Sequence, residues 1–322
     1  MKHENIKNSD FEKFQGSGFK IQELHKPVLL QEILEYLNPQ PGGVFIDATI
    51  NGGGHAAAIA ERIGKNGKLL GIDRDHELVE KLNDSNFKLQ FSCFKIVCDT
   101  FARIKEIAEA NGFTDVNGIV FDLGFSSFHV ELSGRGFSFL RDEPLDMRYD
   151  TKSGISARDI INRWPEEKLR GILFTLGEER YARRIVRGIM EQRERGLVQT
   201  TAELVEIIRK AVPGSYRRGR IHFATRTFQA LRMCVNDELE HVAKGIAAAI
   251  PLLARGGRAA VISFHSGEDR IVKELFREGE RNDILRRITK KPARASAAEC
   301  AQNPRSRSAK LRVAERLSGS TS

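Results

Sequence analysis

The chain has 322 residues, of which 40% are hydrophobic and 30% are charged, a composition typical of a soluble globular protein with a sizeable core. Its length favours one large α/β domain with a second, smaller module. The longest apolar run, residues 246–254, contains Pro251 and is too short to span a membrane. The first twenty residues contain neither an apolar stretch nor an arginine, which argues against a secretory signal and a mitochondrial presequence. We therefore expect a cytoplasmic protein with no membrane segment.

Cysteine usage gives no sign of a metal site or of a disulfide framework. The four cysteines form neither a CxxC pair nor the spacing of a zinc site: Cys93, Cys98, Cys234 and Cys300. We expect scattered structural thiols in a reducing compartment, and no metal.

The net charge of +9 is unevenly distributed along the chain. Residues 151–235 hold 18 Lys/Arg against 9 Asp/Glu, and residues 281–317 hold 11 against 3, so the rest of the chain is acidic. Clustered basic side chains gain free energy by releasing counterions from a nucleic acid. The charge pattern therefore favours a nucleic-acid partner over a surface that is merely solvated.

Short apolar runs alternate with amphipathic stretches in the first half of the chain. Residues 1 to about 20 are polar and predicted to be disordered. The apolar runs predict strands at 44–46, 69–72, 94–97 and 119–121, and the stretches between them predict helices at 55–63, 76–82 and 103–110. This alternation is typical of a parallel sheet with helices on both faces.

The alternation stops after Ser127 and resumes near residue 226. Residues 131–150 read as a loop and residues 156–212 as helices, with Pro165 in a first turn and a capping box at Thr200-x-x-Glu203. The elements predicted after them are a helix at 226–254, a strand at 258–264, a helix at 269–278 and a strand at 310–314. Ser266-x-x-Asp269, at the start of the third of these, has the character of a capping box. We predict an α/β core (23–130 and 236–317) with an inserted loop and helical domain (131–235), and with tails at 1–22 and 318–322.

Three predicted strands end in an aspartate: Asp47, Asp73 and Asp122. Any one of them could be a helix N-cap, which is the common role of Asp at such a position. In open parallel sheets, however, ligands bind outside the carboxyl ends of the strands. Three carboxylates beside a glycine turn therefore indicate a ligand site.

The turn at residues 52–57 fits the G-x-G-x-x-G/A dinucleotide fingerprint, which alone is weak evidence. Five residues separate the predicted strand from the first glycine, and Asp47 would repel a pyrophosphate. S-adenosylmethionine carries an ammonium and a sulfonium, which a carboxylate attracts. Asp73 could accept hydrogen bonds from both ribose hydroxyls, and Phe101 could contact adenine or simply pack in the core.

A series of motifs carries a more specific signal. In chain order they are His25-x-Pro-Val-Leu-Leu, Asp47-x-Thr-x-x-x-Gly-Gly-His55, Asp122-Leu-Gly-x-Ser-Ser127, Arg135-Gly-Phe-Ser-Phe139, Pro144-Leu-Asp-Met-Arg148, Gly177-Glu-Glu-Arg180, Thr225-Arg-Thr-Phe-Gln-Ala-Leu-Arg232, Asn236-x-Glu-Leu239, Ile262-Ser-Phe-His-Ser-x-Glu-Asp-Arg270 and Asn303-Pro-Arg-Ser-Arg-Ser-Ala-Lys-Leu-Arg312. Over roughly residues 24–317 the chain resembles the bacterial small-subunit ribosomal RNA cytosine-N4 methyltransferases, the RsmH or MraW family.

The resemblance implies a class I methyltransferase, with a Rossmann-like, mostly parallel sheet and an inserted α-helical domain. It implies S-adenosylmethionine as the cofactor, and as substrate a cytidine of 16S rRNA at the decoding centre of the small ribosomal subunit. The cofactor residues that it implies are Gly53, Gly54, His55, Asp73, Phe101 and Asp122, together with His129, where the family commonly has Gln. Two further departures are Asn51 in place of a glycine and Gly267 in place of a leucine. Asn tolerates left-handed backbone geometry, so the turn can be kept.

Methylation at cytosine N4 needs a hydrogen-bond acceptor for the amino protons and an in-line approach to the methyl group. We expect Asp122 or a nearby carbonyl to accept these protons and the Ser126 and Ser127 hydroxyls to position the base. In the alternative, Asp122 contacts only the cofactor and the serines cap a turn. The target base must be unpaired or flipped out. Phe137 and Phe139, or Phe264 with His265, could stack on it, or they could be core residues.

The basic segments then have a role in holding RNA phosphates. Arginine suits this role because its guanidinium chelates phosphate and stacks on bases. The RNA-binding candidates are Arg135, Arg148, Arg226, Arg232, His265, Arg305 and Arg307. Any single arginine among them could equally be a solvated surface residue.

Three other functions remain open from the sequence. The first is methylation of another RNA site or of DNA, although the prolines of the DNA amino-methyltransferase motif are absent after Asp122. The second is an RNA-binding ribosome-assembly factor that has lost catalysis, which would bind the cofactor without transferring a methyl group. The third, an NAD-dependent oxidoreductase, is disfavoured by Asp47.

Overall fold

The structure is a computed structural model that describes residues 26–84, 94–124, 127–152 and 154–317. The predicted tails at 1–22 and 318–322, Cys93 and Ser126 lie outside the described residues. Cys98, Cys234 and Cys300 are free thiols. Within the described ranges, no helix combines the length and apolar character needed to cross a membrane.

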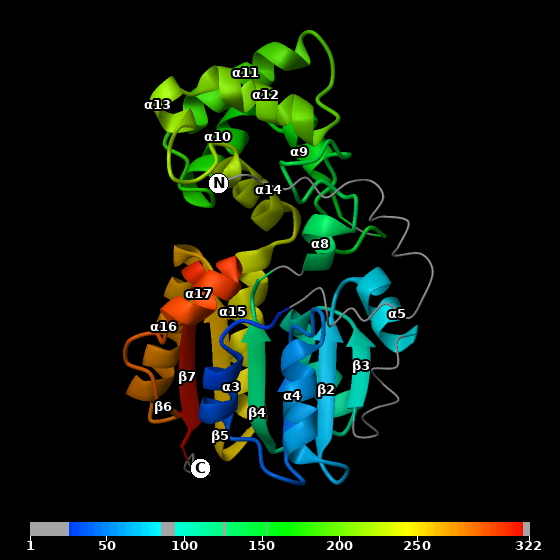
Figure 1. Cartoon of the computed structure of the whole chain (residues 1–322), viewed down its shortest axis with the longest axis vertical. Helices are drawn as coiled ribbons and strands as arrows, with labels where there is room; N and C mark the ends of the chain where they lie inside the picture. Colours follow the sequence, from blue (N-terminus) through cyan, green and yellow to red (C-terminus); the bar gives the residue numbers. More distant parts are fainter. Residues whose placement is uncertain (1–25, 85–93, 125–126, 153, 318–322) are drawn as a thin grey trace.

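A seven-stranded sheet occupies one half of the molecule (Figure 1). Its strands are β1 (Val44–Asp47), β2 (Lys68–Asp73), β3 (Phe94–Cys98), β4 (Val116–Asp122), β5 (Leu253–Ser263), β6 (Leu285–Arg287) and β7 (Lys310–Arg316). Their order in the sheet is β3-β2-β1-β4-β5-β7-β6, in which β1 to β5 are parallel and β7 is antiparallel to both of its neighbours. The predicted mostly parallel α/β sheet is confirmed. The strand order reverses between β1 and β4, which is where such sheets bind ligands.

Helices cover both faces of this sheet. Successive strand residues point to opposite sides, and apolar side chains on both sides need to be buried. In β4, Val120 packs into one apolar cluster, whereas Ile119 and Phe121 pack into the other. The first cluster is covered by α3 (Leu30–Leu37), α4 (Gly54–Ile63) and α5 (His76–Asp84), and the second by α7 (Ile104–Ala110), α15 (Glu238–Ala249) and α16 (Ser266–Arg281). The continuous apolar runs of the central strands thus reflect burial on both faces.

A helical unit with its own core stands over the carboxyl ends of the strands (Figure 1). It contains α9 (Ala157–Arg163), α10 (Glu166–Thr175), α11 (Ala182–Arg193), α12 (Thr201–Ala211) and α13 (Gly214–Arg217), and α14 (Thr225–Val235) leads back to the sheet. The buried residues of the third apolar cluster all fall between Phe137 and Val235. The capping box predicted at Thr200 and Glu203 is present, and Pro165 lies directly before α10. These features support our proposal that residues 131–235 form a unit inserted into the α/β core.

The structure differs from the element predictions in three respects. The single helix predicted at 226–254 is wrong: Asp237, with φ of 48°, separates α14 from α15, and β5 already begins at Leu253. The capping box predicted from Ser266 is also wrong, because His265 is the N-cap of α16 and pairs with Glu268. The sequence did not predict helix α3 or the short elements β6, α8 (Ser127–Glu131) and α17 (Ala297–Gln302). It also did not predict three 3-10 turns: η1 (Phe101–Arg103), η2 (Ile250–Leu252) and η3 (Pro304–Ser308).

Candidate active site

A pocket of about 610 Å³, counting its open mouth, lies at the carboxyl ends of the strands. Asp73 and Asp122, which end β2 and β4, line it from the sheet side. Tyr149 and Asn236 line it from the two segments that connect the core to the helical unit, and Glu268 lines it from the first turn of α16. The pocket is therefore built jointly by the sheet and by the base of the insert.

Two carboxylates on the sheet side of this pocket differ in exposure: Asp47 is almost fully buried, whereas Asp73 lines the pocket and is partly exposed. Burial raises the pKa of Asp73 to about 7 and that of Asp47 to about 7. Asp73 accepts backbone hydrogen bonds from Asn51 (3.1 Å) and Asp75 (2.9 Å), one on each oxygen. Asp47 Oδ1 accepts one from Thr49 at 3.1 Å, whereas its Oδ2 has no hydrogen-bond partner among the described residues. Such acceptors suit a ligand that brings hydroxyl donors and positive charge.

The glycine turn shapes the wall behind these carboxylates. Asn51 and Gly53 have φ of 47° and 79°, so Asn51 does adopt the left-handed geometry expected of it. A Cβ on Gly54 would lie 2.9 Å from the Pro27 ring, so only glycine fits there. His55 is buried and its Nε2 lies 2.9 Å from the Val28 carbonyl.

The predicted cofactor residues fall into two groups. Asp73, Phe101, Asp122 and His129 line the pocket, whereas Asp47, Gly53, Gly54 and His55 lie outside its lining. The Phe101 ring stands edge-on to Phe121, with centroids 5.7 Å apart. Gly245 of α15 packs against this ring so closely that a Cβ there would lie 2.5 Å from it.

His129 joins the sheet to the insert through Asp75. Its Nε2 lies 2.8 Å from Asp75 Oδ2, and Arg135 Nη2 reaches the same oxygen at 2.6 Å. Arg135 also donates to the carbonyls of Arg148 and Tyr149, at 3.0 and 2.8 Å. The segment that carries Tyr149 is thereby held against the end of β2.

Tyr149 and Glu238 form the far side of the pocket, together with Asn236. The Tyr149 hydroxyl donates to Glu238 Oε1 at 3.2 Å, and burial with the Glu238 charge raises the pKa of Tyr149 well above its ordinary value. Asn236 accepts from the Tyr149 amide at 2.9 Å and donates to the Met147 carbonyl at 2.8 Å. Sequence reasoning gave none of these three a role, although Asn236 and Glu238 belong to one quoted motif and Tyr149 directly follows another.

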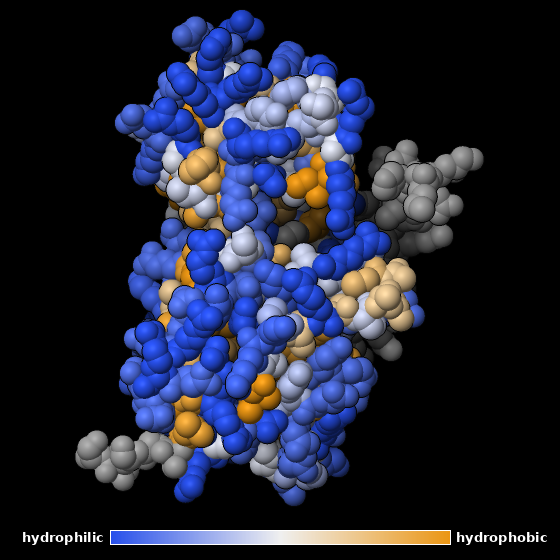
Figure 2. Space-filling view, turned by 90° about the vertical axis from the view of Figure 1, so that its left-hand side faces the viewer, coloured by the Kyte–Doolittle hydropathy of each residue, from blue (hydrophilic) through white to orange (hydrophobic). Residues whose placement is uncertain are grey.

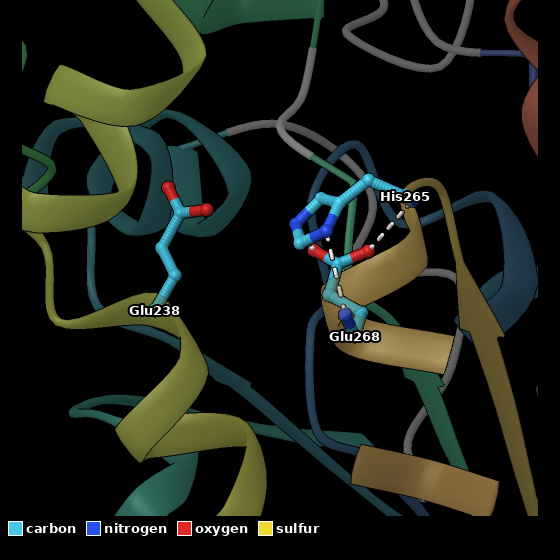
Figure 3. A group of neighbouring side chains, drawn as sticks. All are labelled: Glu238, His265 and Glu268. Carbon is cyan, nitrogen blue, oxygen red and sulfur yellow. Dashed lines mark hydrogen bonds and ion pairs between the residues drawn. The ribbon is translucent and has the colours of Figure 1, made fainter. Parts of the chain in front are cut away.

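Glu238, His265 and Glu268 bring three possible ligand atoms within 4.8 Å of one another (Figure 3). The chemistry of this group does not suit a cation. His265 Nδ1 accepts the Glu268 amide at 3.3 Å, so in the neutral ring Nε2 carries the proton and has no lone pair for a metal. Glu238 is already bound by both Nε and Nη2 of Arg232, at 2.8 and 2.9 Å.

The predicted RNA-binding residues lie in different environments. Arg135 and Arg232 are largely buried in ion pairs with Asp75 and Glu238, with 11% and 12% of their side chains exposed. The remaining arginines are more accessible: Arg148 pairs with Asp146, Arg226 donates to the Glu178 carbonyl, Arg305 lies 3.7 Å from Glu131 and Arg307 is exposed. Buried guanidiniums that hold the fold together have little surface to offer a phosphate.

The serines and aromatic rings predicted to position the base have mixed outcomes. Ser127 begins α8, and its side chain, like Ser126, lies outside the described part of the chain. Phe137 is buried and stacked on Tyr149, with ring centroids 5.3 Å apart. Phe139 is stacked on His222 at 4.5 Å, and the Phe264 ring packs over Gly124. All three rings thus have neighbours within the protein.

Comparisons with known proteins identify the family. A model described as the MraW methylase family matches residues 22–317. The ribosomal RNA small subunit methyltransferase H of Trichlorobacter lovleyi is 42% identical over 308 residues, which cover 91% of this chain and 98% of the relative. Its namesake from Geotalea uraniireducens is 42% identical over 312 residues, with the same coverage.

Among solved structures, a putative rRNA-methylase from Clostridium thermocellum aligns over 91% of this chain and 98% of its own, at 14% identity and a TM-score of 0.45. That likeness is too weak to carry an argument, and the assignment depends on the sequence matches. The chain belongs to the MraW methylase family, and it is a methyltransferase that uses S-adenosylmethionine.

Proposed function

We propose that the protein methylates N4 of a cytidine in 16S rRNA, at the decoding centre of the small ribosomal subunit. The printed name of its relatives, small subunit methyltransferase H, supports the substrate. The observation that carries the proposal is a single pocket with Asp73 and Phe101 among its lining residues together with Asp122, Glu238 and Glu268. A pocket of this kind has room for a nucleoside-bearing cofactor and also presents acceptors to an amino group.

The lining residues fit S-adenosylmethionine. Asp73 lines the pocket at the end of β2, where ribose hydroxyls can donate to its carboxylate, and Phe101 offers an apolar surface for adenine. Asp47 adds a buried acceptor that favours positive charge nearby. When bound, this cofactor supplies an electrophilic methyl group.

Asp122 is our candidate acceptor for the amino proton of the base. It ends β4 at the reversal point of the strand order, beside Gly124 and the beginning of α8. A carboxylate in hydrogen-bond contact with the amino group would keep the nitrogen lone pair directed away from the ring plane and would receive the proton that nitrogen loses. His55 Nδ1 lies 3.8 Å from Asp122 Oδ2.

The basic surface of the insert is suited to rRNA. Arginines on α11, at the end of α13 and in the segment after it are exposed: Arg183, Arg184, Arg187, Arg217, Arg218 and Arg220. Hydrophilic side chains cover most of the face shown in Figure 2, over the insert as well as the core. With residues 151–235 strongly basic, this surface can hold RNA phosphates while the target base reaches the pocket. We place this activity in the cytoplasm, on the small subunit.

Labelled S-adenosylmethionine and small subunits from a strain that lacks the family enzyme provide the test. We expect N4-methylcytidine at the decoding centre, and we expect Asp122→Asn to lower turnover by at least tenfold while cofactor binding persists. Label in another nucleoside would redirect the proposal to another RNA site. Cofactor binding with no transfer to any RNA would favour an assembly factor that has lost catalysis.

A further inference from the structure

Two carboxylates on opposite sides of the pocket face each other. Glu238 comes from the first turn of α15 and Glu268 from the first turn of α16, and both line the pocket. Figure 3 shows the Glu238 carboxylate turned toward the imidazole of His265 and the carboxylate of Glu268. One oxygen of each glutamate and a ring nitrogen of His265 all lie within 4.8 Å of one another.

The surrounding residues fix all three groups in position. Glu268 Oε2 accepts the amides of Phe264 (2.8 Å) and His265 (3.3 Å), and its side chain is 2% exposed. Glu268 Oε1 lies 2.9 Å from His265 Nε2. Glu238 is held by Arg232 and by the Tyr149 hydroxyl. Since neither carboxylate needs to move, the pair is an organised acceptor site rather than a loose acidic patch.

This spacing fits one exocyclic amino group. An N–H···O bond is about 2.9 Å long, and the two N–H bonds of a planar amine diverge by about 120°, so its two acceptors lie about 5 Å apart. A carbonyl oxygen in the same place would face two carboxylates and be repelled. His265 Nε2, which carries a proton, is a donor beside these acceptors, as the ring nitrogen N3 of cytosine requires.

The sheet brings this pair close to Asp122. In the parallel β4–β5 pair, Asp122 is in register with Ile262, and β5 ends at Ser263, two residues before His265. The first turn of α16 therefore begins beside the end of β4. A base whose amino group lies between the two glutamates has that group at the same edge of the sheet as the candidate proton acceptor.

We propose that Glu238 and Glu268 hold the amino group of the target cytosine, with His265 beside them, and that this pair makes the enzyme select cytosine over uracil. The inference rests on the proposed function, since it names the residues that recognise that substrate. Glu238 and Glu268 are positioning and specificity residues, which accept the two amino hydrogens as the base docks. As the nitrogen becomes tetrahedral on methylation, one N–H turns from its glutamate to Asp122, which remains the candidate acceptor of the proton that the nitrogen loses.

The test compares binding of cytidine and uridine 5′-monophosphate by ligand-observed NMR, with the protein saturated by S-adenosylhomocysteine. We expect the wild-type protein to prefer the cytidine nucleotide by at least tenfold and Glu268→Gln to bring that ratio close to one. Gln can still accept the capping hydrogen bonds from Phe264 and His265, so α16 should keep its N-terminus. Matched controls on the same helices are Glu274→Gln and Glu240→Gln, which change exposed glutamates.

Glu238→Gln leaves Arg232 without its carboxylate, so Glu238→Gln is also made together with Arg232→Gln, and unchanged binding of S-adenosylhomocysteine serves as the folding control. A wild-type protein without a cytidine preference, or a preference that survives in Glu268→Gln, overturns the inference. A melting temperature raised by Mg²⁺ or Zn²⁺ in the wild type but not in Glu268→Gln would assign the site to a cation and also overturn it. The proposed function fails separately, if the wild-type enzyme forms no N4-methylcytidine on small subunits.

Discussion

His129 donates its Nε2 hydrogen to the Asp75 carboxylate across 2.8 Å, at the place where the insert meets the sheet. Burial lowers the pKa of His129, so the ring is neutral near pH 7 and acts as a donor. Although burial of Asp75 acts in the opposite direction, the hydrogen bond from His129 and the charge of Arg135 keep the pKa of Asp75 below its ordinary value. A neutral donor and a cation thus share one buried carboxylate.

Removing this carboxylate should loosen the junction. Asp75→Asn leaves the largely buried Arg135 with only the half-exposed Glu77 as a counter-charge, and we expect a loss of about 3–5 kcal/mol in the free energy of unfolding, measured by urea denaturation. Glu77→Gln is the control, because Glu77 is half-exposed and lies 3.5 Å from the same guanidinium, so its loss should cost less than about 1 kcal/mol. Equal effects of the two changes would contradict a buried junction.

The pH dependence of this contribution has a definite sign. A carboxyl whose pKa is lower in the folded state stabilises the protein above its unfolded pKa, and that contribution is lost as the pH falls through the folded value. The stability difference between wild type and Asp75→Asn should therefore shrink below about pH 4, which is the ordinary aspartate range. A difference that grows on acidification would argue against an ionised Asp75.

Cofactor affinity should depend on pH through Asp73. Burial raises the pKa of Asp73 to about 7, so in the free protein it is largely protonated at pH 6 and ionised at pH 8. Ribose hydroxyls donate to the ionised form, and we expect the affinity for S-adenosylhomocysteine, measured by calorimetry, to rise about tenfold from pH 6 to pH 8. Asp73→Asn should bind more weakly and show a smaller rise, because Asp47, whose pKa burial also raises to about 7, is still present. A rise of the same size in Asp73→Asn would exclude Asp73 as its source.

The sequence alone predicted the carboxyl edge of the sheet well, because that edge follows from local pattern. Apolar strand runs that end in aspartate put Asp47, Asp73 and Asp122 at neighbouring strand ends, and the structure has all three there. The alternation of strands and helices was enough to indicate a sheet covered on both faces.

The far side of the pocket could not be predicted in the same way. Tyr149, Glu238 and Glu268 come from three separate segments, and only the packing of the insert on the sheet brings them together. The break between α14 and α15 was also hidden, because Asp237 adopts a left-handed conformation without a glycine or proline to signal it. Arg135 and Arg232 likewise looked like surface charges until their buried partners were located.

Two arginines from the predicted RNA-binding set should behave differently when changed to Gln. Arg307 is exposed, so Arg307→Gln should leave the melting temperature unchanged and, if Arg307 contacts a phosphate, lower the salt-dependence slope of RNA binding by about 0.7–0.9. Arg232→Gln removes the partner of Glu238 and should lower the melting temperature instead. Filter binding over a salt series and thermal melts distinguish the two. An unchanged slope in Arg307→Gln would remove Arg307 from the RNA surface.

Gly245 links the stability of α15 to the cofactor pocket through Phe101. A Cβ at Gly245 would lie 2.5 Å from the Phe101 ring and 2.9 Å from its carbonyl oxygen, so Gly245→Ala must displace Phe101 or the helix. We expect a loss of about 1–3 kcal/mol in the free energy of unfolding from overpacking, together with weaker binding of S-adenosylhomocysteine.

Gly171 of α10 is the matched control, because it also lies in a helix but a Cβ there would meet no atom within 4 Å. Gly171→Ala should be neutral or stabilising by up to about 1 kcal/mol, since alanine has the higher helix propensity, and it should leave cofactor binding unchanged. Urea denaturation and calorimetry on both variants give the comparison. If Gly245→Ala gained stability as Gly171→Ala does, the contact between α15 and Phe101 would be looser than the structure has it, and the Phe101 ring would be held in the pocket by Phe121 and His241 rather than by Gly245.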